Sequence, residues 1–182
     1  MEDGKIKAQI MDAAAMKRAL TRIAHEILEH QKGTENLVLV GILRRGLPLA
    51  QKISDAIEQI EGTRVPVGKL DITFYRDDLS TIDATPVLKN VSIGQEINEK
   101  NVVLVDDVIY TGRTVRAAIE GLFRSGRPKT VRLAVMIDRG LRELPIRPDF
   151  VGKNIPTSQR EIVSVKVQEF DGEDSVSILS KE

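Results

Sequence analysis

Apolar side chains recur along much of the chain at the spacing of an amphipathic helix. Residues 12–31 carry them at steps of three and four, beginning with Met16 and Leu20, which predicts a helix with one buried face. Residues 47–60 also predict a helix, and the Gly62 that follows is a residue type that commonly ends one. Two long helices are therefore expected in the first third of the chain.

Short apolar or alternating runs predict strands between and after these helices. The predicted strands cover residues 37–43, 66–75, 101–105, 130–137, 162–167 and 175–179. A further helix is predicted at 115–125, directly after one of these runs. Because strands alternate with helices over most of the chain, we predict an α/β fold with a mainly parallel sheet flanked by helices on both faces.

Two stretches lack a regular apolar period. Residues 76–100 are polar and predict a long loop with a hairpin near 87–91, and residues 138–160 are rich in turn-forming residues. A loop of this length is uncommon unless it is functional, and a functionless insertion is the alternative for its middle part. We expect one domain over residues 1–182, with a small β-containing hood formed mainly by 138–182 and with room for an N-terminal contribution.

Composition narrows the classes of function. The 182 residues are 41% hydrophobic and 30% charged, which is typical of a soluble globular protein. Cysteine is absent, so disulfides, thiolate metal sites and cysteine nucleophiles are excluded. No apolar run has the length of a membrane span and no secretion signal is evident, so we expect a cytoplasmic protein. Net charge is zero, so a nucleic-acid partner would have to meet a local basic patch.

The segment 102–114 carries the strongest functional pattern. Four apolar residues lead into Asp106 and Asp107, and a turn with the sequence Thr-Gly-Arg-Thr follows at 111–114. A buried strand therefore delivers two carboxylates to its carboxyl end, where open α/β sheets bind ligands. Backbone N–H groups at the start of the next helix favour a phosphate. The pattern suits a sugar phosphate, and ordinary capping of a turn is the weaker alternative because a cap needs one short polar residue.

Two other predicted strands end in charged residues. Arg44 and Arg45 follow the first strand in a turn between Gly41 and Gly46, and such a turn favours phosphate oxygens, although a solvated basic turn is the plainer alternative. The sequence Asp-Arg-Gly at 138–140 ends a later strand. Its aspartate either positions a base or a metal-bound water, or braces the turn as an Asp–Arg pair.

The 102–114 segment resembles the phosphoribosyl pyrophosphate (PRPP) signature of type I phosphoribosyltransferases over its whole length. The resemblance implies that Asp106 and Asp107 hold the ribose hydroxyls, and that a loop beginning at Arg76 closes over the site. It also implies Mg²⁺ bound with PRPP, with no residue assigned as its ligand. The family commonly has threonine where this chain has Arg44, so Arg45 is the closer match in the pyrophosphate loop. The catalytic residues implied are Asp106, Asp107 and Arg76, and the PRPP- and nucleotide-binding residues implied are Arg44, Arg45, Gly46, Asp106, Asp107, Val108, Ile109, Tyr110, Thr111, Gly112, Arg113, Thr114, Asp138 and Arg139.

Segments 20–26, 71–79 and 138–154 narrow the resemblance to members of that family that also regulate pyrimidine operons. The resemblance implies transfer from PRPP to uracil, giving UMP and pyrophosphate, and binding of operon leader mRNA that depends on UMP or UTP. Uracil selection is expected near Arg139 and residues 162–164, and a homodimer or higher homo-oligomer is expected. A salvage phosphoribosyltransferase without RNA binding is the alternative. The RNA-binding residues implied are Thr21, His25, Arg142, Arg147 and Lys153.

Overall fold

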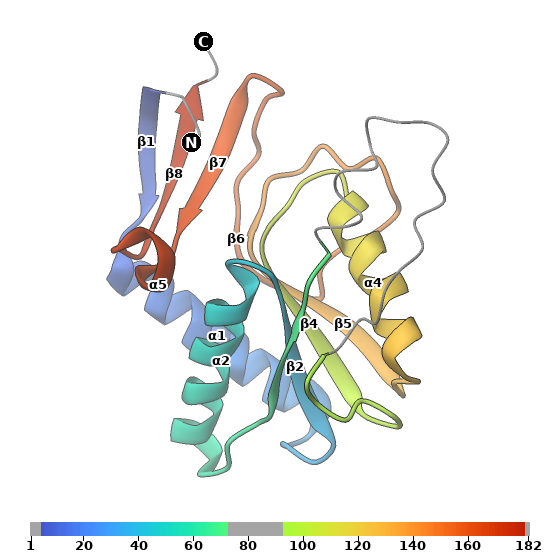
Figure 1. Cartoon of the computed structure of the whole chain (residues 1–182). Helices are drawn as coiled ribbons and strands as arrows, with labels where there is room; N and C mark the ends of the chain where they lie inside the picture. The colour runs from blue at the N-terminus through green and yellow to red at the C-terminus, as the bar shows by residue number, and fades with distance from the viewer. Residues whose placement is uncertain (1–4, 73–92, 181–182) are drawn as a thin grey trace, which may run out of the picture.

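The chain forms a parallel sheet with a smaller antiparallel sheet beside it (Figure 1). This computed structural model describes residues 5–72 and 93–180. The larger sheet has five strands in the order β3-β2-β4-β5-β6, and every neighbouring pair is parallel. Its strands are β2 (Leu37–Ile42), β3 (Val67–Leu70), β4 (Asn101–Ile109), β5 (Thr130–Asp138) and β6 (Phe150–Asn154).

Helices cover both faces of this sheet, which confirms the predicted α/β arrangement. Helices α1 (Ala13–Gln31) and α2 (Gly46–Glu61) lie on one face, and α4 (Arg113–Ser125) lies on the other (Figure 1). Alternate side chains of β2 enter separate apolar clusters, Leu39 with α1 and α2, and Val40 with α4. Burial on both faces explains why these central strands are continuous apolar runs. Within residues 5–72 and 93–180, no helix is long and apolar enough to cross a membrane.

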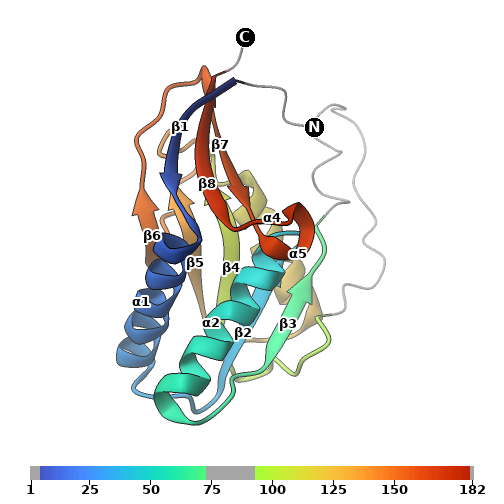
Figure 2. The same ribbon diagram turned by 90° about the vertical axis from the view of Figure 1, so that its left-hand side faces the viewer.

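The smaller sheet, which we call the hood, joins the two ends of the chain. Its strands are β1 (Lys5–Met11), β7 (Glu161–Lys166) and β8 (Ser175–Ser180), in the order β1-β8-β7, with the short helix α5 (Gln168–Asp171) between β7 and β8. Val163 and Val176 belong to the same apolar cluster as α1 and α2. The hood therefore packs on the main core, and α5 lies against the amino-terminal half of α2 (Figure 2).

The predicted helices and strands are confirmed, with two changes at strand ends. The prediction ended the strand that begins at residue 101 at residue 105, whereas β4 continues to Ile109 because β5 extends alongside it, with Ile109 opposite Asp138. The strand predicted over 66–75 is wrong for residues 71–72, because β3 pairs only with β2 and both end together at the Ile42–Leu70 pair. Residues 73–75 lie outside the described residues.

Two edge strands were not predicted. Strand β1 is exposed over most of its length, and β6 lies inside the stretch 138–160 that the sequence marked as turn-rich. A hood boundary at residue 138 was therefore wrong for β6, which pairs with β5 in the main sheet. Residues 93–100 form the predicted loop without helix or strand. The hairpin predicted near 87–91 lies outside the described residues, and the single-domain assignment stays a prediction.

Candidate functional site

A cleft of about 760 Å³ lies where the carboxyl ends of four parallel strands meet the hood. The chain order reverses between β2 and β4, because β2 connects outward to β3 on one side and β4 connects to β5 on the other. Open α/β sheets bind ligands at such a point. The residues that line it are Ile42, Leu43, Arg44, Arg45, Asp71, Ile72, Asp106, Asp107, Val108, Ile109, Tyr110, Thr111, Gly112, Thr114, Val115, Arg139 and Val163.

The paired acids Asp106 and Asp107 lie within the carboxyl-terminal half of β4 rather than after the strand. Asp106 is only 6% exposed, and its Oδ1 accepts a hydrogen bond of 2.9 Å from the backbone N–H of Asp107. Asp107 Oδ1 in turn accepts one of 2.8 Å from the N–H of Val108. Burial raises the pKa of Asp107 above its ordinary value of 3.8, against the opposing effects of these hydrogen bonds and of the nearby Arg45. The site thus holds a carboxyl group that is poorly solvated and faces a cleft.

The turn after β4 leads directly into the amino terminus of α4. Gly112 is the N-cap, with φ near 95°, and has no side chain to cap the helix. A residue with a side chain is strained at that φ, which accounts for glycine here. The Thr111 hydroxyl accepts a hydrogen bond of 3.3 Å from the N–H of Arg113. Thr111 and Thr114 line the cleft beside these backbone N–H groups. A helix start that has glycine as its N-cap and faces a polar cleft is suited to an anion.

Arg113, although predicted with this turn, is directed elsewhere. Its Nη2 lies 2.7 Å from Glu143 Oε2, both side chains are about half exposed, and Arg113 is absent from the residues that line the cleft. The structure thus separates Arg113 from its neighbours Thr111 and Thr114. The Arg113 side chain therefore does not face the cleft, and its place in the predicted PRPP set stays a prediction that would rest on its backbone N–H.

The loop between β2 and α2 approaches β4 closely. A Cβ atom on Gly46 would lie 2.3 Å from the carbonyl oxygen of Val105, so only glycine fits where α2 begins. The Leu43–Arg44 peptide is cis. Arg44 is exposed and lines the cleft. This loop thus brings Arg44 and Arg45 to the rim of the cleft.

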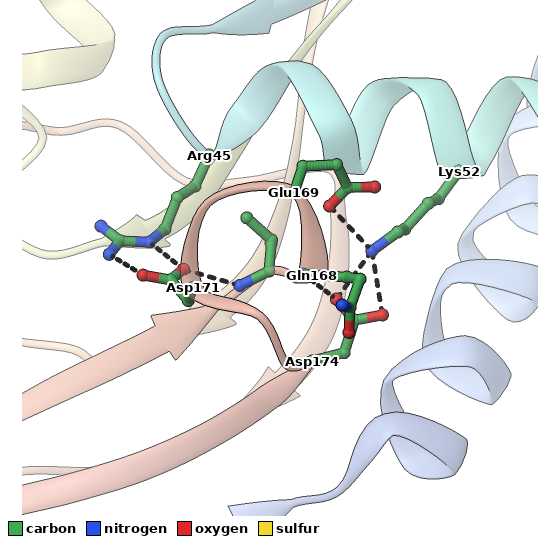
Figure 3. Close-up of polar contacts among 7 residues, drawn as sticks. Arg45, Lys52, Gln168, Glu169, Asp171 and Asp174 are labelled. Atoms are coloured by element: carbon green, nitrogen blue, oxygen red, sulfur yellow. Dashed lines mark hydrogen bonds and ion pairs between the residues drawn. The ribbon is translucent and has the colours of Figure 1, made fainter.

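Arg45 makes a two-point ion pair with the hood (Figure 3). Its Nε lies 3.1 Å from Asp171 Oδ2, and its Nη2 lies 2.9 Å from Asp171 Oδ1. The backbone N–H of Val167 also donates to Asp171 Oδ2 at 2.8 Å. Hydrogen bonding to Arg45 lowers the pKa of Asp171, which keeps the carboxylate ionised. A second bridge runs from Lys52 on α2 to Asp174, at 2.7 Å.

Arg139 lines the cleft but is largely buried by its own partners. Its guanidinium carbon lies 4.2 Å from the centre of the Tyr110 ring, and its Nη2 donates to the backbone oxygens of Ser158 and Glu161 at 3.0 and 2.8 Å. It therefore fixes the segment before β7 against the turn that follows β4. The neighbouring Asp138 does not line the cleft, because its Oδ2 pairs with Arg142 Nη2 at 2.6 Å. Of the alternatives for Asp138, the structure shows an Asp–Arg pair that braces a turn.

Arg142, predicted as an RNA contact, points inward. Its side chain is 19% exposed, and it donates to the backbone oxygens of Tyr110 and Ile146 at 2.8 and 3.0 Å. It braces residues 139–147 against the turn after β4. Arg142 also lines the surface hollow that Arg147 lines, and its direct contact with RNA stays a prediction. Arg147, from the same loop, is exposed and lines a separate surface hollow with Asn154.

The other predicted RNA contacts lie on α1 and β6, which pack together. Arg22 Nη2 donates to the backbone oxygens of Val151 and Gly152, at 3.0 and 2.6 Å. His25 is exposed on the helix face that also carries Thr21, and both line a shallow hollow. Lys153, directly after Gly152 on β6, is exposed. The fold thus brings an α1 face and the exposed end of β6 to one side of the molecule.

Several cleft residues were not assigned from the sequence, notably Leu43, Asp71 and Ile72. Asp71 comes directly after β3, but the prediction placed it inside a strand that ran to residue 75, so its position at a strand end was not signalled. Gly46 and Asp138 belong to the predicted set but do not line the cleft. The predicted Arg76 lies outside the described residues.

Comparison with known proteins agrees with this arrangement. The model of the phosphoribosyl transferase domain family matches residues 7–169. A crystal structure of a hypoxanthine phosphoribosyltransferase from Staphylococcus aureus has a TM-score of 0.72 at 20% identity, covering 96% of this chain and 93% of its own. One from Trypanosoma cruzi has a TM-score of 0.73 at 18% identity, covering 97% and 98%. The fold is therefore the type I phosphoribosyltransferase fold, and the chain is a phosphoribosyl transferase domain protein.

Closer relatives define the branch of that family. Bifunctional protein PyrR of Clostridioides difficile is 61% identical over 94% of this chain and 97% of its own. Proteins of the same name from Oceanobacillus iheyensis and Thermus aquaticus are each 57% identical, over 97% and 98% of this chain and 99% and 98% of their own. The chain belongs to the PyrR family.

Proposed function

We propose that this protein transfers a phosphoribosyl group from PRPP to uracil, and that bound UMP or UTP favours its binding to pyrimidine-operon leader mRNA. The observation that carries the proposal is the cleft itself. It places two acids of β4 beside the glycine-capped start of α4, at the reversal point of a parallel sheet. Relatives named bifunctional PyrR support both halves of the proposal.

The two ends of the cleft suit the two ends of a ribose phosphate. The carboxylates of Asp106 and Asp107 would accept hydrogen bonds from vicinal hydroxyls, which are strong when the acceptor is ionised. The backbone N–H groups that follow Gly112, with the hydroxyls of Thr111 and Thr114, would hold the 5′-phosphate. A rigid sheet edge fixes both sets, so the sugar would be held in one orientation for attack at C1.

The pyrophosphate end lies at the loop between β2 and α2. Arg44 and Arg45 would stabilise the negative charge that grows on the leaving group. Within residues 5–72 and 93–180, no group of three or more His, Cys, Asp or Glu side chains is placed to hold a metal. Asp71, Asp106 and Asp107 nevertheless offer carboxylates to the cleft, and Mg²⁺ commonly binds one or two carboxylates together with substrate phosphates. The residues fit Mg²⁺ that arrives with PRPP, and it would supply charge neutralisation at the pyrophosphate.

The uracil end of the cleft lies under the hood. Arg139, stacked on Tyr110, and Val163 of β7 close that end. We propose that they frame the base, with the backbone of residues 162–164 reading its polar edge. The attacking atom is a ring nitrogen of uracil, so the protein supplies position and electrostatic stabilisation and no nucleophile.

For RNA, the predicted set includes the exposed residues His25, Arg147 and Lys153 and the half-buried Thr21. They come from α1, β6 and the loop before β6, and they would contact backbone, 2′-hydroxyls and unstacked bases of an RNA hairpin. A homodimer would double this surface. Arg142 would act indirectly, by bracing the loop that carries Arg147.

Both halves are tested on one preparation. Initial rates with uracil and PRPP measure transfer, and a gel-shift titration with leader RNA, with and without UMP, measures regulation. UMP should tighten RNA binding, and the Arg147→Gln variant should weaken RNA binding while its uracil turnover stays normal. No effect of UMP would remove the regulatory half, and faster turnover of hypoxanthine or guanine than of uracil would favour the salvage alternative.

A further inference from the structure

We propose that Asp171 in the hood is a positioning residue for the transfer reaction, because it holds the guanidinium of Arg45 at the pyrophosphate end of the cleft. The inference rests on the proposed phosphoribosyl transfer and adds a residue from a different sheet to its machinery. Asp171 itself does not line the cleft. Its effect would pass through Arg45, which does.

Asp171 contacts Arg45 at two points. Arg45 is engaged along the Nε–Nη2 edge of its fork, at 3.1 and 2.9 Å, in the two-point arrangement that gives such pairs directional specificity (Figure 3). An arginine side chain has several rotatable bonds, so an unpaired guanidinium can adopt many directions. The two-point contact therefore selects one direction for the guanidinium.

The Asp171 side chain is itself held in place by a backbone hydrogen bond. Its Oδ2 accepts the backbone N–H of Val167, at the start of α5. Its side chain is 18% exposed and that of Arg45 is 35% exposed, so the pair is partly shielded from water. Partly shielded charge pairs hold their geometry better than fully exposed ones, which exchange readily with solvent.

The Arg45–Asp171 pair lies next to the cleft that would hold PRPP. Arg45 lines the same cleft as Asp107, and its charge acts to lower the pKa of that acid. Asp171 would thus fix the separation between the positive charge that receives pyrophosphate and the acid that receives ribose. Phosphoryl oxygens bind best to a guanidinium that is already correctly oriented, because less side-chain conformational entropy is then lost on binding.

The chain offers a matched control on the same interface. Asp174 also joins the hood to α2, through Lys52 Nζ at 2.7 and 2.9 Å, and Asp174 also accepts a backbone N–H, from Gln168. Neither Lys52 nor Asp174 lines the cleft. Loss of Asp174 would weaken the attachment of the hood without releasing Arg45.

The experiment compares Asp171→Asn, Asp171→Glu and Asp174→Asn with the wild-type protein, by initial rates over separate PRPP and uracil series and by thermal unfolding. Asp171→Asn should raise the KM for PRPP about tenfold, the order expected for a lost hydrogen bond between charged groups, with the KM for uracil unchanged. Asp171→Glu should recover part of the loss. Asp174→Asn should lower the unfolding temperature and keep the wild-type KM for PRPP.

A KM for PRPP in Asp171→Asn that matches Asp174→Asn would overturn the proposal, since Asp171 would then serve only to attach the hood. A KM below the wild-type value would also overturn it, because Asp171 would then compete with the ligand for Arg45. Should the wild-type protein fail to turn over uracil, the proposed function fails by itself. Calorimetric binding of pyrophosphate with Mg²⁺ to the same variants then decides the role of Asp171, with the same tenfold weakening expected.

Discussion

Asp107 at the carboxyl end of β4 and Asp171 in the hood helix α5 are both influenced by Arg45, but their pKa values are shifted in opposite directions. Burial raises the pKa of Asp107, so its ionised form is disfavoured by folding. Hydrogen bonding to Arg45 lowers the pKa of Asp171, so its ionised form is favoured. Ionised Asp107 therefore destabilises the folded state, and Asp107 faces the cleft. Ionised Asp171 stabilises the folded state through its pair with Arg45. Perturbed groups such as Asp107 are characteristic of functional sites.

The largest effect is expected from Asp107→Asn. The variant should lose about 100-fold in kcat/KM, because hydrogen bonds from the ribose hydroxyls to a charged acceptor are lost. It should unfold at a higher temperature at pH 7. The destabilisation from Asp107 is full above its raised folded-state pKa and vanishes below the ordinary value of 3.8, so the gain should disappear in acid. Normal turnover, or a lower unfolding temperature at pH 7, contradicts the assignment.

Gly46→Ala tests the loop that brings Arg45 to both acids. The added methyl group would lie 2.3 Å from the Val105 carbonyl oxygen, which belongs to the backbone of β4 and cannot move aside cheaply. We expect a loss of about 1–3 kcal/mol in the free energy of unfolding, measured by urea denaturation. An unchanged urea midpoint would show that the loop does not press on β4 in solution.

The hood acid gives a smaller, pH-dependent effect. A lowered folded-state pKa contributes stability that is present above the ordinary value of 3.8 and is lost as the pH falls through the folded-state value. Asp171→Asn should therefore be less stable than wild type by about 1 kcal/mol near pH 7, and the two curves should converge in acid. Thermal unfolding across this pH range measures the difference, and a gap that widens in acid is the opposite of this expectation.

The smallest effect is expected where the charges are exposed. Arg113 and Glu143 are 54% and 51% exposed and lie outside the cleft. Glu143→Gln should change the free energy of unfolding by less than about 0.5 kcal/mol and leave uracil turnover unchanged. A large loss of turnover would place Arg113 back among the cleft residues.

The sequence predicted the β4 part of the candidate site and a contribution from residues 162–164 of the hood, but it missed the contact between Arg45 and the hood for a physical reason. Asp106 to Thr114 are contiguous, so their order along the chain already fixes their order along a strand, a turn and a helix start. Arg45 and Asp171 are 126 residues apart, and no local periodicity signals that contact. Strands β1 and β6 were missed because edge strands need not be apolar on both faces. The inward direction of Arg142 depends on carbonyl groups that become available only in the folded loop.

The central claim is that the acids of β4 and the start of α4 together hold a ribose phosphate, and a crystal structure with UMP tests it most directly. The account predicts the phosphate at the backbone N–H groups after Gly112, and the ribose hydroxyls within hydrogen-bond distance of Asp106 and Asp107. A nucleotide bound at any other place, with these groups facing only water, would contradict it.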